Sequence, residues 1–400
     1  MDFEHIVVGA GISGLGAAHF AARAGVPTLV LERSNRIGGC INSHQFANCG
    51  DFWTEAGSHT CFNSYGTLIS ILEDLDQLDR LTPKADGSYR LWRQDQLRPV
   101  LSGLHPLEAL ISLPRLARRS KADASVADYY GAILGRRNYR DLLGPAFQAL
   151  VCQPADDYPA ELLFRRKPRR KDIARKFTFP RGLSEIPAAI ARQPEIEVRT
   201  AQEIRGIVGD GNGFRIQLTA GDELRCDYLT LAVPPDVAAR LLPKHLTNAK
   251  AAVDEIAMAE IETLLVAFRV ADLDLPAIAG LISVDDAFYS AVSRDFLPDE
   301  QYRGFAFHFR PGALDAEAQI GAACHALGAR PADVVENAHI GNRLPALRKG
   351  HHRTVERLDA ALAGTHLAIT GNWFYGVSLE DALTRSRQEH QRLFSNRLNG

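Results

Sequence analysis

The residues of this chain with the clearest chemical potential are three glycines and an acid near its N-terminus. Gly9, Gly11 and Gly14 have the spacing G-x-G-x-x-G, and Glu32 follows them. In such a loop the first glycine permits a tight turn, the second lets the backbone approach a pyrophosphate, and the third lets a helix pack closely on a strand. A carboxylate placed after the next strand can accept hydrogen bonds from ribose hydroxyls. This combination predicts a dinucleotide site.

The elements that must position these residues are also visible in the sequence. Residues 3–8 form an apolar run rich in β-branched residues, the alanines of residues 17–22 recur at helical spacing, and residues 28–31 form a second apolar run. They predict a strand, a helix and a strand. Ser13 then lies at the start of the helix, where free N–H groups would face the phosphates. A glycine-rich turn without a ligand is the alternative, but the complete strand, helix and acid favour the dinucleotide.

A second pair of glycines bears on which dinucleotide is bound. Glu32 is followed by Arg33 and then by Gly38 and Gly39, and this stretch resembles the GG-doublet motif of the flavin-dependent amine oxidase superfamily. That superfamily includes protoporphyrinogen oxidases, phytoene-type desaturases and L-amino-acid oxidases. The resemblance implies FAD held by a Rossmann-like domain. Cys40 departs from the motif, because these proteins usually carry a basic residue there, near the FAD phosphates.

The resemblance also implies cofactor contacts farther along the chain. Gly57, Ser58 and His59 end a predicted strand that in the superfamily runs beneath the flavin, so Ser58 or His59 would reach the isoalloxazine edge. A surface loop is the alternative for His59. UDP-galactopyranose mutases carry a similar Gly-Ala-His stretch. Ile204 stands at the position whose backbone pairs with adenine in the family.

The C-terminal segment is expected to return to the cofactor. Gly371 and Asn372 end a predicted strand and resemble the family's contact to the phosphate and ribityl groups. Val377 and Ser378 precede a predicted helix over residues 380–393. The positive end of that helix dipole would point at the flavin and stabilise negative charge on it.

Length and composition describe an ordinary two-domain protein. Four hundred residues are more than a domain with a single hydrophobic core usually contains. A composition of 46% hydrophobic and 24% charged residues is typical of globular enzymes. A net charge of −2 is too small to attract partners by itself, so any electrostatic attraction must be local. The six cysteines lack metal-ligand spacing, which predicts no metal site and reduced thiols in the cytoplasm. Neither a secretory signal nor a membrane-spanning stretch is expected, because the longest apolar run, residues 263–284, is interrupted by charges.

We expect an α/β fold with a discontinuous FAD-binding domain of residues 1–79, 177–247 and 344–400. The substrate domain would combine a helical part, residues 80–176, with a sheet part, residues 248–343, over which the substrate lies. Apolar and alternating runs predict strands in the sheet part, and helical spacing predicts helices. The predicted strands are residues 262–268, 281–284 and 304–309, and the predicted helices are residues 316–326 and 331–338.

Two basic segments lie in the helical part. Residues 105–121 combine an apolar face with a basic end, which is more often a helix packed on the core than one lying on a membrane surface. Arg165–Lys176 is a dense cationic run, either an exposed solubilising loop or a docking patch for an anionic substrate, an acidic lipid or an acidic protein. Nucleic acid is the least favoured partner, because no aromatic stacking platform accompanies the run.

The resemblance implies an FAD-dependent oxidoreductase that moves a hydride from a C–H bond of a small-molecule substrate to flavin N5. No cysteine stands in the family's covalent-attachment context, so FAD would be bound non-covalently. His59 and His308 are the candidate catalytic residues, although a lone strand histidine such as His308 is more often structural. The alternatives are a non-redox flavin enzyme of the UDP-galactopyranose mutase type and a non-catalytic flavin-binding partner protein. The substrate, the electron acceptor and the oligomeric state do not follow from the sequence.

Overall fold

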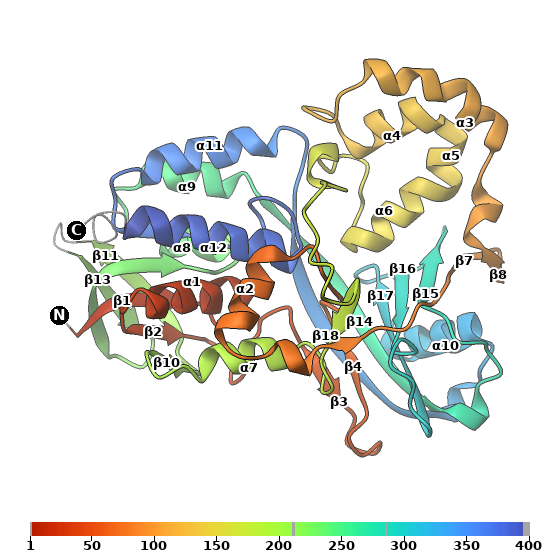
Figure 1. Ribbon diagram of the computed structural model, residues 1–400, viewed down its shortest axis with the longest axis horizontal. Coiled ribbons are helices and arrows are strands. Elements are labelled where there is room, and N and C mark those ends of the chain that lie inside the picture. Colours follow the sequence, from red (N-terminus) through yellow and green to blue (C-terminus); the bar gives the residue numbers. More distant parts are fainter. Residues whose placement is uncertain (1, 210–212, 285, 395–400) are drawn as a thin grey trace.

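Two large β-sheets divide the molecule between them (Figure 1). The structure, a computed structural model, describes residues 2–209, 213–284 and 286–394. The first sheet is largely parallel, and the second is mostly antiparallel. A separate group of helices lies beyond the second sheet. This arrangement confirms the predicted α/β fold, a Rossmann-like sheet combined with a mixed sheet.

The first sheet contains the strands predicted around the glycine loop. In sheet order its strands are β10 (Ile196–Arg199), β2 (Thr28–Leu31), β1 (Phe3–Val8), β13 (Glu223–Leu231), β12 (Phe214–Leu218) and β11 (Ile204–Gly209), with β19 (Leu367–Ile369) also paired to β13. The strands β1, β2 and β19 are largely buried on both faces, which is why they appear as continuous apolar runs. The sheet draws on all three segments expected for the FAD-binding domain.

The second sheet carries the three strands predicted for the sheet part and four more. In sheet order they are β18 (Val334–Ala346), β14 (Ala257–Arg269), β17 (Tyr302–Phe309), β16 (Phe288–Ser293), β15 (Gly280–Ser283), β7 (Tyr89–Arg93) and β8 (Gln96–Pro99). The three predicted strands are β14, β15 and β17, whereas β7 and β8 lie in the segment expected to be helical. Small sheets join β3 (Ser43–Gln45) to β4 (Trp53–Glu55), and β5 (Cys61–Phe62) through β9 (Lys176–Thr178) to β6 (Thr82–Pro83).

Most helices cover the first sheet or form the separate lobe, whereas α10 (Ala316–Leu327) packs on the second sheet (Figure 1). The other α-helices are α1 (Ile12–Arg23), α2 (Gly66–Asp74), α3 (Pro106–Ser112), α4 (Val126–Leu134), α5 (Arg136–Asn138), α6 (Gly144–Val151), α7 (Glu185–Ala191), α8 (Pro235–Leu241), α9 (Thr247–Asp254), α11 (His351–Leu362) and α12 (Leu379–Leu393). Shorter helical turns are η1 (Leu78–Arg80), η2 (Val100–Gly103), η3 (Leu113–Arg118), η4 (Tyr139–Leu143), η5 (Ala160–Leu162), η6 (Val270–Asp272) and η7 (Pro331–Asp333). No helix in the described ranges is long and apolar enough to cross a bilayer.

The strand β18 contradicts the predicted helix over residues 331–338. Only the turn η7 is helical there, and β18 then pairs along its length with β14. Val334 and Ala338 have the i, i+4 spacing of a helix, which explains the wrong prediction. In the structure, the even-numbered residues from 334 to 344 are partly buried on one side of the strand. Pairing with β14 therefore outweighs the local preference.

Residues 105–121 do not form a helix that packs its apolar face on the core. The helix α3 ends at Ser112, and the segment continues in the tighter turn η3. Leu107, Leu110 and Ile111 are 77%, 68% and 73% exposed. The expectation of a core-facing helix was therefore wrong.

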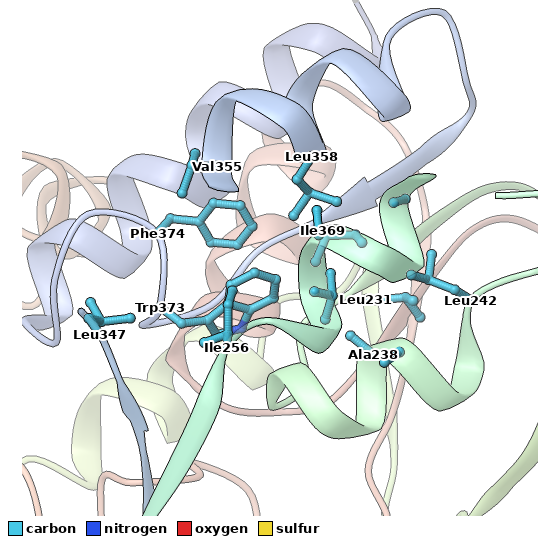
Figure 2. Packing of buried hydrophobic residues seen from close by; sticks show 14 of the residues in the cluster. Leu231, Ala238, Leu242, Ile256, Leu347, Val355, Leu358, Ile369, Trp373 and Phe374 are labelled. Carbon is cyan, nitrogen blue, oxygen red and sulfur yellow. The ribbon is translucent and has the colours of Figure 1, made fainter. Parts of the chain in front are cut away.

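A cluster of buried side chains fixes the turn that follows β19 (Figure 2). Trp373 and Phe374 stack with ring centroids 4.2 Å apart, and the indole N–H of Trp373 donates to the carbonyl oxygen of Val233 at 3.2 Å. Around them lie Leu231, Ala238, Leu242, Ile256, Leu347, Val355, Leu358 and Ile369. This packing holds Gly371 and Asn372 at the carboxyl end of β19.

A buried carboxyl group supports the strand that leads to residues 57–59. Glu55 is 4% exposed, and its carboxyl oxygens accept hydrogen bonds from the Leu183 N–H at 2.7 Å and the Ser43 hydroxyl at 2.9 Å. Burial raises the pKa of Glu55 from 4.5 to about 7, although these bonds, Lys84 and Arg294 oppose the shift. Ionising this group in the folded protein therefore costs free energy.

We predict that Glu55→Gln becomes more stable relative to the wild-type protein as pH rises. Below pH 4.5 both carry a neutral side chain, whereas above about pH 7 only the wild type holds a buried charge. The difference in free energy of unfolding should shift in favour of the variant by about 3 kcal/mol between these limits. Urea unfolding at a series of pH values measures it, with exposed Glu300→Gln as the control. A difference that does not change with pH would refute the assignment.

Candidate functional site

One cavity of about 1000 Å³ brings together segments from the whole chain. It lies where the carboxyl ends of β1, β2 and β19 meet the second sheet, the usual place for a ligand in such folds. Every predicted cofactor residue but one lines it, and so does His308; these are Gly9, Gly11, Ser13, Glu32, Arg33, Gly38, Gly39, Cys40, Gly57, Ser58, His59, Ile204, Gly371, Asn372, Val377 and Ser378. The exception is Gly14, which lies beneath the loop. A Cβ atom there would be 1.9 Å from the Gly9 carbonyl oxygen.

The two glycine loops form a cradle of bare backbone at one end of the cavity. Gly11 and Gly38 form a parallel bridge, and the Gly38 N–H donates to the Ala10 carbonyl oxygen at 2.8 Å. Gly9 has φ +101°, which side chains rarely adopt. A Cβ atom on Gly11 would meet only the Gly39 Cα, at 3.9 Å, so it would point into open space. The cradle therefore fits phosphate groups, which could approach the amides at the start of α1.

The charged side chains around this cradle are held in place. One carboxylate oxygen of Glu32 accepts the Ala10 N–H at 2.8 Å, and the other accepts the Ser34 N–H at 2.9 Å. The second oxygen also accepts the Ser34 hydroxyl, at 2.5 Å, so the first oxygen keeps a lone pair for a ribose hydroxyl. The Arg36 guanidinium lines the cavity and donates to the Gly39 carbonyl oxygen at 2.9 Å. A positive charge thus lies beside the doublet even though residue 40 is a cysteine.

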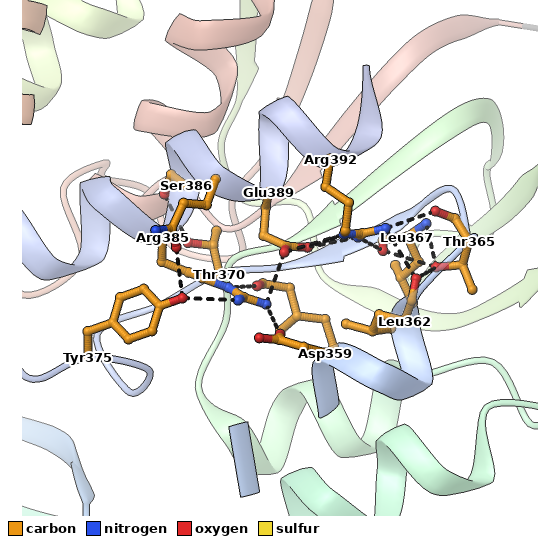
Figure 3. A network of polar contacts seen from close by, with 12 residues as sticks. Asp359, Leu362, Thr365, Leu367, Thr370, Tyr375, Arg385, Ser386, Glu389 and Arg392 are labelled. Carbon is orange, nitrogen blue, oxygen red and sulfur yellow. Dashed lines mark hydrogen bonds and ion pairs between the residues drawn. The ribbon is translucent and has the colours of Figure 1, made fainter. Parts of the chain in front are cut away.

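A polar network fixes the helix whose N-terminus faces the cavity (Figure 3). The Ser386 hydroxyl donates to the Ser13 carbonyl oxygen at 2.8 Å, which joins α12 to α1. Arg385 is 2% exposed; it donates to the Ile369 carbonyl oxygen at 3.1 Å and pairs with Asp359 at 2.6 Å. Val377 and Ser378 therefore line the cavity from a rigid position, and the dipole of α12 favours negative charge there.

The two candidate catalytic histidines both reach the cavity, and both are neutral. Burial lowers the pKa of His59 to about 3, assisted by Lys84 and by His308. Burial also lowers the pKa of His308 to about 4, and its Nδ1 lies 3.2 Å from the Thr263 hydroxyl. At neutral pH neither imidazole carries a charge, so each can donate or accept a hydrogen bond but is a weak base.

Lys84 is a site residue that the sequence did not indicate. Its Nζ donates to the His59 carbonyl oxygen at 2.6 Å and to the Thr60 hydroxyl at 2.7 Å, and it lies 3.2 Å from the centre of the Phe296 ring. Burial lowers its pKa to about 7, with Lys176 acting in the same direction and Glu55 opposing. A lysine after a proline in a loop carries no pattern that would have revealed it. The pairing of β6 with β9 brings Lys84 beside Lys176.

Half of the eight cations in the run Arg165–Lys176 form ion pairs. Arg165 and Lys167 both pair with Asp381, which lies in the first turn of α12. Arg170 pairs with Asp172 and Glu73, and Lys176 pairs with Asp86 at 3.2 Å. Of the run, only Lys176 lines the cavity. The run therefore offers a ligand in the cavity only Lys176, which lies beside Lys84, rather than a dense cationic patch.

The remaining part of the cavity is an apolar arm between the second sheet and the helical lobe. Aromatic and aliphatic side chains line this arm, among them Tyr89, Tyr130, Leu134, Phe147, Leu150, Phe164, Ile282 and Val292. Such a surface excludes water from a bound ligand. Across the described residues, no cluster of His, Cys, Asp or Glu could hold a metal ion.

Comparison with known proteins gives a consistent result. The sequence pattern of flavin-containing amine oxidoreductases matches residues 12–294. A 15-cis-phytoene desaturase from Synechococcus elongatus is 34% identical over 79 residues, and one from Narcissus pseudonarcissus is 37% identical over 78. Each stretch is 20% of this chain, and the stretches span 16% and 13% of the two relatives.

Solved structures resemble the whole chain. A putative protoporphyrinogen oxidase from Exiguobacterium sp. superposes with a TM-score of 0.79 at 17% identity and full coverage of both chains. Reduced UDP-galactopyranose mutase gives 0.77 at 15% identity, covering 99% of this chain and 96% of the other. Putrescine oxidase bound to putrescine gives 0.70 at 13% identity, covering 99% of each. Identities this low establish the fold, while the matched pattern extends over more than half of the sequence. The chain therefore belongs to the flavin-containing amine oxidoreductases and is a flavoprotein oxidoreductase of that family.

Proposed function

We propose that the chain binds FAD non-covalently and oxidises a small to medium-sized organic molecule that carries an anionic group, by removal of a hydride from a C–H bond. The observation that carries the proposal is a single cavity with three parts: a backbone cradle, a strand end at residues 57–59, and an apolar arm with two lysines at its side. FAD would supply the electron acceptor.

The residues of the chain fit the cofactor. The cradle at Gly11 and Gly38 would hold the pyrophosphate, Glu32 the ribose, and the start of α12 the flavin end. Burial raises the pKa of both cysteines that line the cavity, Cys40 and Cys152, the latter to about 12. Protonated thiols are poor nucleophiles, which supports non-covalent binding.

The substrate side of the cavity supports an anionic ligand. Lys84 uses two of its three donors on His59 and Thr60 and can offer the third to a carboxylate. Lys176 lies close enough to affect its pKa. The neutral imidazoles of His59 and His308 would orient the ligand without adding charge, and the apolar arm would keep water from the reacting carbon.

We predict that Gly11→Val folds but does not retain FAD. The backbone at Gly11 has φ −72°, which valine accepts, and the new side chain would occupy the cradle. The Kd for FAD should rise at least about tenfold, while the melting temperature of the apoprotein stays within a few degrees of the wild-type value. Gly321→Val, on the open surface of α10, controls for a generic effect of the substitution. A yellow Gly11→Val protein with wild-type flavin content would contradict the cradle.

We also predict that binding of a carboxylate weakens as Lys84 loses its proton. Titration of the holoenzyme with benzoate, followed by the flavin spectrum, should show an affinity that falls above about pH 7, because the depressed pKa leaves the amine neutral there. In Lys84→Met the affinity should be lower, roughly tenfold near pH 6, and should not vary around pH 7. Exposed Lys171→Met should behave as wild type. An unchanged pH profile in Lys84→Met would exclude this role.

The proposed reaction is tested by anaerobic mixing of the holoenzyme with amines, amino acids, porphyrinogens and polyenes, each acid being paired with its methyl ester. Loss of flavin colour with an acid, and a weaker response with its ester, is the expected result. A compound that is converted without loss of flavin colour and without consumption of an electron acceptor would instead indicate a non-redox isomerase. If no compound in a broad set reduces the flavin, the non-catalytic alternative gains support.

A further inference from the structure

The helical lobe carries a group of large apolar side chains that no described element covers. Large exposed apolar side chains concentrate in residues 101–116. We call these seven the apolar face: Leu101, Leu104, Leu107, Leu110, Ile111, Leu113 and Leu116. The helix α3 lies at the outer edge of the lobe (Figure 1). A concentration of exposed apolar side chains usually marks an interaction site.

The apolar face is held outward by a fixed inner side. The Glu108 carboxylate accepts hydrogen bonds from the backbone N–H groups of Arg137 and Asn138 at 3.2 and 3.1 Å. The Asn138 side chain donates to the His105 carbonyl oxygen at 3.0 Å and accepts the His105 N–H at 2.7 Å. Ser112 is 2% exposed. The polar residues of α3 thus face α5, and its leucines face solvent.

Positive charge borders the apolar face. Arg115, Arg118 and Arg119 are exposed, and Lys121 follows them. No acidic residue occurs between Glu108 and Asp123. A short amphipathic segment with an apolar face and only cations beside it matches the surface of a bilayer that contains anionic lipids.

The same border continues to the mouth of the cavity. Lys121 donates from Nζ to the Leu163 carbonyl oxygen at 2.9 Å and lies 6.0 Å from the centre of the Phe164 ring. Phe164 and Leu150 line the cavity and are 67% and 53% exposed. Exposed apolar lining of the cavity therefore lies beside the basic end of this segment, at Lys121.

We propose that the apolar face docks on an anionic phospholipid bilayer, with its leucines in the interface and Arg115, Arg118 and Arg119 at the headgroups. Docked in this way, the exposed Phe164 beside Lys121 lies near the bilayer, and an amphipathic molecule can enter the arm from there. The docking step does not depend on the proposed reaction, so either can fail without the other.

A second copy of the chain fits this surface less well. In a symmetric dimer the same patch meets itself and provides no opposite charge for the arginines, because no acidic residue occurs between Glu108 and Asp123. An anionic leaflet instead provides the opposite charge over the whole border, and it accepts leucines without a matching shape. The charge argument therefore favours the membrane.

The test is co-sedimentation of the full-length holoenzyme with vesicles of phosphatidylcholine alone or mixed with phosphatidylserine. The wild type should bind the mixed vesicles, with binding weakened by salt. Leu107→Ser/Leu110→Ser/Ile111→Ser should lower the partition coefficient at least about tenfold, and Arg115→Gln/Arg118→Gln/Arg119→Gln should do the same. These side chains are exposed, so the flavin spectrum and melting temperature should match the wild type.

Matched controls take exposed residues from elsewhere on the chain. Val208→Ser/Val270→Ser and Arg205→Gln/Lys244→Gln/Arg269→Gln should bind vesicles as the wild type does. Absence of wild-type binding to the mixed vesicles overturns the proposal, as does equal binding by the apolar-face variants and these controls. Wild-type dimerisation in sedimentation velocity that the leucine variant abolishes, without vesicle binding, would assign the surface to a second copy.

Discussion

The close packing of α1 on α12 is the contact on which the cavity depends. A Cβ atom on Gly16 would be 2.4 Å from the Leu383 Cδ2 atom, so the Leu383 side chain packs directly over this glycine. The Ser386 hydroxyl closes the contact by donating to the Ser13 carbonyl oxygen. Because α1 follows the first glycine loop and α12 follows the Gly371 turn, this one interface places both N-termini at the same ligand.

Loss of hydration explains the unusual charges at the other end of the cavity. Burial is the largest cause of the raised pKa of Glu55 and of the lowered pKa values of His59, His308 and Lys84. These groups lie where the small sheets meet the second sheet, away from bulk water. The result is a site with two neutral imidazoles and a lysine whose pKa is about 7. The protonation of these groups therefore depends more on the charge of a bound ligand than on the net charge of the protein.

The parts of the site that were predictable from sequence are those whose cause is local. The loop at Gly9 and Gly11 and the acid Glu32 follow from backbone geometry within one strand–helix–strand unit, and the structure places them in one cavity. Lys84 was not predictable, because its position results from the pairing of β6 with β9 across the inserted helical lobe. The strand β18 and the outward leucines of α3 were missed for the same reason, because the pairing with β14 and the contact of Glu108 with α5 join residues distant in the sequence.

The cavity is cationic beside residues 57–59 and apolar at its mouth, and this difference constrains the orientation of a bound substrate. The lysines lie beside residues 57–59, whereas the mouth at Leu150 and Phe164 is apolar. An amphipathic molecule that enters at the mouth would move its anionic end toward Lys84 and leave its apolar part in the arm. The reverse orientation would bury the anion among aromatic side chains, away from Lys84, at a cost of several kcal/mol. The charge distribution alone therefore selects one orientation, and with it which carbon lies nearest to the strand end at His59.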